Sequence, residues 1–113
     1  MKCFRTYRFD VIGFTTELRD DGAALASLVL AGRTRNAERV YADRVEVGVP
    51  GRDRTLLNAL ESMTLTQAQA ERAPVTASIT WVAPKLSAEV RCLAWEPGRY
   101  IRDGALRGLA LAP

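Results

Sequence analysis

The stretch that decides the fold is WVAPKLSAEVRCLAWEPGRYIRDGALRGLALAP, residues 81–113. Its first half alternates in character. Every second residue is apolar: Leu86, Ala88, Val90 and Cys92. Such a period of two predicts a half-buried strand over 80–96. An EPG turn follows, and the arginine-bearing segment after it predicts one more strand, within 99–112.

Three further strands are expected upstream. The segment 3–15 alternates but shifts its apolar parity at Gly13, which predicts a long strand with a bulge or bend at the glycine. After an RDDG turn at 19–22, the apolar run 23–32 predicts a buried strand, and 39–49 predicts a third strand whose parity also shifts midway.

One helix is expected, in the sequence PGRDRTLLNALESM at 50–63. Asp53 is a candidate N-cap. One face is apolar: Leu56, Leu57, Leu60 and Met63. The Ala-rich segment 64–78 is either a connection or an extension of this helix.

The order of these elements predicts the fold class. Three strands, a helix and two strands form the order of the OB-fold, a five-stranded Greek-key barrel with its helix between strands three and four. We therefore expect a mainly β protein with one OB-fold domain over 1–113. A generic α+β sandwich is the alternative architecture.

Composition narrows the classes of function. The chain has 113 residues and a net charge of +3, and it contains no histidine. Lysine occurs only at Lys2 and Lys85, so fourteen of the sixteen basic residues are arginine, which suits bidentate phosphate contact. No apolar run reaches the ~18 residues of a membrane span. The N-terminus is too charged for a signal peptide, so a cytoplasmic protein without membrane contact is expected.

The reactive side chains do not form a recognisable catalytic set. Without histidine, no serine has the usual activating base, and the commonest metal ligand is missing. Cys3 and Cys92 are far apart in sequence, so we expect two buried thiols with no metal site and no disulfide. Glu89 lies between Lys85 and Arg91 on the polar face of its strand, where charge pairing is favoured over catalysis.

The two tryptophans bracket the strand at 80–96. Trp81 and Trp95 could pack against the core or could stack on bases of a bound nucleic acid. We favour packing for both.

The segment 80–109 resembles the C-terminal OB domain of bacterial ATP-dependent DNA ligases of the end-joining, ligase D type. That family carries a W-V-x-P-x-L-x-x-E-V strand, an E-W turn and an arginine segment ending in G-L. The matching residues here are Trp81, Val82, Pro84, Leu86, Glu89, Val90, Trp95, Arg102, Gly108 and Leu109. Further matches upstream are Lys2, Cys3, Phe9, Val11, Ile12, Gly13, Phe14, Tyr41, Ala42, Val45 and Gly48.

The resemblance implies roles for two residues. Lys2 would be the second lysine of a K-x-K element that contacts nucleotide phosphates, and Arg102 would open the last ligase motif. The chain has no K-x-D-G element and hence no adenylation lysine. We therefore expect no activity and no cofactor for this chain alone, with ATP and magnesium serving only a complete ligase. Where the family has a charged tail, this sequence reads Ala110–Pro113.

Two functions remain open. The first is contact with the backbone of duplex DNA, beside a ligase nucleotidyltransferase domain or another repair protein. The candidate residues are Arg8, Arg44, Lys85, Arg91, Arg99 and Arg107, together with Arg102. The alternative is a stand-alone, degenerate OB domain that acts as a protein-interaction module. Acidic residues at Asp43, Glu46 and Asp103 favour this alternative.

Overall fold

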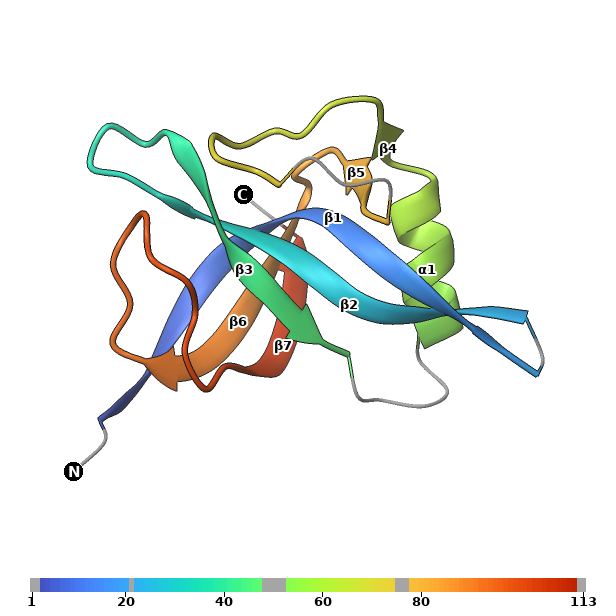
Figure 1. Cartoon of the computed structure of the whole chain (residues 1–113), viewed down its shortest axis with the longest axis horizontal. Helices are drawn as coiled ribbons and strands as arrows, with labels where there is room; N and C mark the ends of the chain where they lie inside the picture. The colour runs from blue at the N-terminus through green and yellow to red at the C-terminus, as the bar shows by residue number, and fades with distance from the viewer. Residues whose placement is uncertain (1–2, 21, 48–52, 75–77, 112–113) are drawn as a thin grey trace.

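A computed structural model describes residues 3–20, 22–47, 53–74 and 78–111. Within these residues the chain forms one antiparallel sheet of seven strands and one helix (Figure 1). The elements are β1 (Phe4–Arg19), β2 (Gly22–Arg33), β3 (Arg39–Glu46), α1 (Asp53–Glu61), β4 (Thr64–Leu65), β5 (Thr80–Val82), β6 (Leu86–Leu93) and β7 (Ala105–Leu111). The prediction of a mainly β, OB-like fold is confirmed.

The long strand β1 is the central strand of the sheet. One edge pairs with β2, and the other pairs first with β6 and then with β5. Its register against β2 shifts between Val11 and Gly13, which confirms the predicted irregularity at the glycine. A Cβ on Gly13 would lie 2.9 Å from the carbonyl oxygen of Thr80, so a larger residue would push β5 away. Gly13 thus allows β1 to pair with both β6 and β5 along one edge.

The sheet curls into a barrel that stays partly open. Its path runs β3-β2-β1-β5-β4, while β6 pairs with β1 and β7 pairs with β6. The two ends of the curl, β3 and β7, come near each other, but they form no ladder among the described residues (Figure 1).

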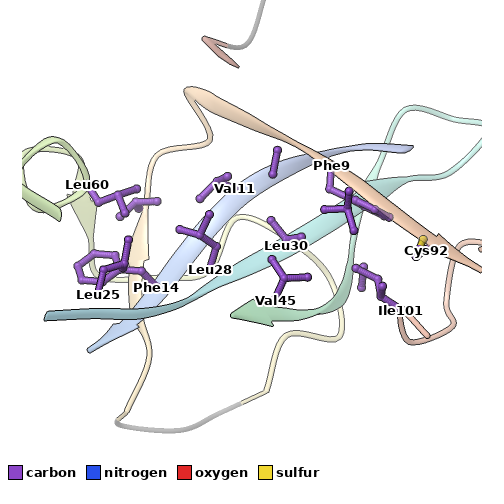
Figure 2. Packing of buried hydrophobic residues seen from close by; sticks show 14 of the residues in the cluster. Phe9, Val11, Phe14, Leu25, Leu28, Leu30, Val45, Leu60, Cys92 and Ile101 are labelled. Carbon is purple, nitrogen blue, oxygen red and sulfur yellow. The ribbon is translucent and has the colours of Figure 1, made fainter. Parts of the chain in front are cut away.

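The main core fills the inside of this curl, and α1 closes one end of it. Figure 2 shows Phe9, Val11, Leu28 and Leu30 gathered between the strands, with Leu60 reaching in from α1. As predicted, α1 presents its apolar face to this core, with Met63 packing just beyond its last residue.

A smaller cluster lies on the opposite face of β1 and β2. It consists of Ile12, Val29, Ala31 and Ile79, with the half-buried Trp81 packed against it. The prediction that Trp81 packs against the protein interior is confirmed.

The structure resolves one open alternative and corrects one prediction. The segment 64–78 does not prolong the helix. It forms β4 and then reaches β3, where Glu71 bridges Val40. The strand expected at 80–96 is two strands, because the pairing of this segment with β1 is interrupted around Pro84, which lacks an N–H. The strand predicted within 99–112 is confirmed, and among the described residues it covers Ala105–Leu111.

Candidate nucleic-acid interface

Every predicted contact residue that the structure describes carries an exposed side chain. Lys2 lies outside the described residues. The others fall in three places rather than on one surface. Arg8, Arg91 and Arg107 lie on β1, β6 and β7, with Lys85 in the turn before β6. Arg99 and Arg102 lie on the β6–β7 connection, and Arg44 lies on β3.

The outer face of β1 and β6 brings Arg8 and Arg91 together. In the antiparallel register Arg8 lies opposite Glu89, and Thr6 lies opposite Arg91. The guanidinium carbon of Arg91 sits 4.8 Å above the ring centre of Phe4, a cation–π contact that holds this side chain against the sheet. Arg8 and Glu89 also border a shallow hollow of about 90 Å³.

The surroundings of Arg44 are acidic. It lines a hollow of about 560 Å³ with Glu17, Asp43 and Glu46. The pKa of the neighbouring Tyr41 is raised by burial and, to a smaller extent, by the charge of Asp43. Three carboxylates around one guanidinium repel a phosphate, so this part of the sheet suits a basic or neutral partner better than DNA.

The β6–β7 connection carries Arg99 and Arg102 on an exposed turn. The Arg99 Nε atom lies 3.8 Å from Glu96 Oε2, and both side chains are more than three-quarters exposed, so this pair adds little stability. The backbone carbonyl of Arg102 accepts a hydrogen bond of 3.1 Å from the Leu93 N–H. This bond fixes the backbone at Arg102 while its side chain stays exposed.

The structure reveals a charged cluster that sequence reasoning missed. Asp10 on β1 is almost buried, and its Oδ2 atom accepts hydrogen bonds of 3.0 Å from both Arg33 Nε on β2 and Arg39 Nε on β3. Half of the Arg33 side chain is exposed, against a tenth of the Asp10 side chain. Three neighbouring strands thus fix one carboxylate between two guanidinium groups.

A hollow of about 380 Å³ opens beside this cluster. We call it the Arg33 hollow; it is bordered by Tyr7, Arg8, Asp10, Gly32, Arg33 and Trp95. Its lining residues come from β1, from the end of β2 and from the start of the β6–β7 connection.

Trp95 is one of the residues that line the Arg33 hollow. Its backbone N–H donates a hydrogen bond of 3.0 Å to the Tyr7 hydroxyl, and its Nε1–H donates one of 2.7 Å to the Arg99 carbonyl. Its ring meets Phe9 edge to face at 4.8 Å and lies directly over Gly32. The expected packing role of Trp95 is confirmed.

The missed cluster leaves only a weak trace in the sequence. The connection RTRNAER at 33–39 holds three arginines and a single acid. Thr34 organises its turn, because its carbonyl and hydroxyl accept backbone N–H groups from Asn36, Ala37 and Glu38. The partner Asp10 lies more than twenty residues away, and only the strand pairing shows the contact.

The remaining reactive side chains offer no catalytic centre. Both cysteines are free thiols, but only Cys92 is buried, so the prediction that both are buried is wrong for Cys3. Cys3 lies just before β1 and outside its ladder with β6, which begins at Phe4. In the described part of the chain no cluster of acidic, cysteine or histidine residues is arranged to hold a metal ion. No described helix has the length and apolar character to cross a membrane.

Comparisons with solved structures identify the class of protein that this fold resembles. No model of a known protein family matches the sequence, and no curated protein does. Solved structures do match, among them two of DNA ligases. The chain is therefore structurally related to ATP-dependent DNA ligase.

The particular relatives are ligase D proteins of mycobacteria. One is the ligase domain of LigD from M. tuberculosis, with a TM-score of 0.76 and 24% identity over 95% of this chain. The other is mycobacterial DNA ligase D complexed with ATP and MES, with a TM-score of 0.73 and 27% identity over 95% of this chain. The chain spans 35% of the length of each of these structures.

Proposed function

We propose that this chain is an OB domain of the kind found at the C-terminal end of a DNA ligase, and that it contacts the backbone of duplex DNA. The observation that carries the proposal is the match of nearly the whole chain to ligase D structures. The exposed arginines on the β1–β6 face and on the β6–β7 connection are consistent with it, because guanidinium groups bind phosphates without reading sequence.

On this proposal the chain supplies binding, while a nucleotidyltransferase domain supplies the chemistry of nick sealing. ATP would be the adenylate donor of such a complete ligase, with magnesium as its metal. The only lysines here are Lys2 and Lys85, and neither lies in a K-x-D-G element, so we derive no adenylation step for this chain. Lys2 and Arg102 would contact nucleotide phosphates only with that second domain in place.

A second candidate is a protein-interaction module, which the acidic hollow around Arg44 favours. An anisotropy titration at low salt separates the two functions. We expect a labelled nicked duplex and a second duplex of unrelated sequence to bind with similar affinity. Failure to bind either duplex at low salt would contradict the DNA-binding function and leave the interaction module as the candidate.

A further inference from the structure

We propose that the Arg33 hollow is a binding site for one phosphate group, with Arg8 and Arg33 as the contacting residues and Asp10 and Arg39 as positioning residues. This inference deepens the proposed function, because it assigns the phosphate contact to a defined place on the barrel. Arg8 is among the contact residues that the sequence predicts, whereas Arg33, Asp10 and Arg39 are not.

The first argument is the balance of charge. Asp10 is the one carboxylate in the cluster and is held between two guanidinium groups at 3.0 Å each. The cluster therefore keeps a net positive charge. Arg8 adds a further positive charge at the rim of the hollow, opposed in register by the exposed Glu89. An anion that enters the hollow meets an excess of positive charge.

The second argument is the set of unused donors. A guanidinium carries five N–H groups in a planar fork. The bonds to Asp10 engage the Nε atom of Arg33 and of Arg39, and no other described side chain accepts from either group. Arg33 borders the hollow and is half exposed, so its terminal N–H groups are available to phosphate oxygens.

The third argument is preorganisation. The long arginine side chain normally loses much rotamer freedom when it binds a ligand. Here Asp10 is almost buried, and it fixes Arg33 before any ligand arrives. Arg39, about one-third exposed, holds the same carboxylate oxygen from β3. Asp10 therefore acts through Arg33 rather than on the ligand.

The fourth argument is the shape of the site. The volume of about 380 Å³ lies within the range of roughly 300–1,000 Å³ that is usual for small-ligand sites. Its lining includes Gly32 and the aromatic residues Tyr7 and Trp95, and aromatic rings suit contact with the sugar beside a phosphate.

The test uses phosphate-bearing probes on the whole chain and follows the Gly32 amide and the Trp95 indole N–H by NMR. Thymidylyl thymidine supplies an internal phosphodiester, thymidine monophosphate supplies a terminal phosphate, and thymidine is the control. We expect both signals to move with at least one phosphate probe and to stay in place with thymidine. Whichever phosphate probe binds more tightly identifies the source.

Four variants separate a built site from general attraction. Arg33→Ala should weaken probe binding about tenfold, in keeping with the loss of charge-assisted hydrogen bonds. Arg35→Ala removes the same charge from the same connection and should leave binding unchanged. Arg33→Lys keeps the positive charge of the cluster, and Asp10→Asn makes it more positive. Both should nevertheless weaken probe binding several-fold, because the first removes the planar guanidinium and the second removes the carboxylate that orients it. Dispersed amide spectra confirm that each variant is folded.

The outcomes are distinct. No signal movement with any phosphate probe overturns the inference, and so does equal binding by Arg33→Ala. If Asp10→Asn binds the probes more strongly and Arg33→Lys binds them unchanged, net charge alone explains the binding, and the inference is also overturned. If the probes fail but long duplex DNA binds, the proposed function survives without this site. If the probes bind but duplex DNA does not, the phosphate site survives without the proposed function.

Discussion

Replacing Gly32 with alanine should destabilise the barrel through one contact, the indole of Trp95. A Cβ built on Gly32 lies 1.9 Å from Trp95 Cη2 and 2.7 Å from its Cζ2 and Cζ3 atoms. Carbon atoms in contact are normally about 3.5–4.0 Å apart, so the ring has to leave its place. Gly32 does not have a positive φ, so the cost is steric and does not come from backbone strain.

The size of the destabilisation by Gly32→Ala follows from the contacts that the Trp95 indole loses. Overpacking a well-packed site costs about 1–3 kcal/mol. A displaced Trp95 also gives up the 2.7 Å hydrogen bond from its Nε1–H to the Arg99 carbonyl, worth about 1 kcal/mol. We therefore expect Gly32→Ala to lower the free energy of unfolding by about 2–4 kcal/mol in urea denaturation.

A double-mutant cycle isolates this contact. In a Trp95→Ala background the same Gly32→Ala change meets no ring, and alanine in place of glycine in a strand should then stabilise the chain by about 0.5–1 kcal/mol. The predicted coupling energy is therefore about 2.5–5 kcal/mol. Effects that add within about 0.5 kcal/mol would refute the packing of Trp95 on Gly32.

Three further predictions can be tested separately. Incubation with ATP and magnesium should add no AMP to the chain by mass spectrometry, and a stoichiometric adduct would contradict the absence of an adenylation lysine. In the native state Cys3 should react readily with a maleimide, while Cys92 should react only on unfolding. Burial raises the pKa of the Cys92 thiol, so the folded state disfavours its thiolate. The free energy of unfolding should therefore fall as the pH rises above about 8.5. Changing Arg91 and Arg102 together to Ala should flatten the salt dependence of duplex binding by about 0.9 per lost phosphate contact, and an unchanged slope would remove both residues from the interface.

The sequence predicts the elements that depend on local pattern. The irregularity at Gly13 follows from a parity shift in the apolar residues, and the apolar face of α1 follows from its leucine spacing. The break at Pro84 is also local, but the alternation of apolar residues on both sides of it favours one strand. Only the strand pairing shows that both halves pair with β1 while their second partners differ, β4 for β5 and β7 for β6.

The candidate site is less predictable, because it depends on contacts between distant strands. Asp10, Arg33 and Arg39 have ordinary neighbours in the sequence, and only the β1–β2–β3 register brings them to one point. Around Arg44 the sequence already shows Asp43 and Glu46, but Glu17 on β1 joins them only through the fold. Such clusters follow from the order and register of the strands.

The salt dependence of duplex affinity tests the central claim most directly. A few arginine–phosphate contacts should give a slope of log K against log salt of about −2 to −4, at roughly −0.9 per neutralised phosphate. The account predicts weak, sequence-independent binding at low salt with a slope in this range. Absence of binding at low salt, or binding whose affinity does not change with salt, would contradict backbone contact by this domain.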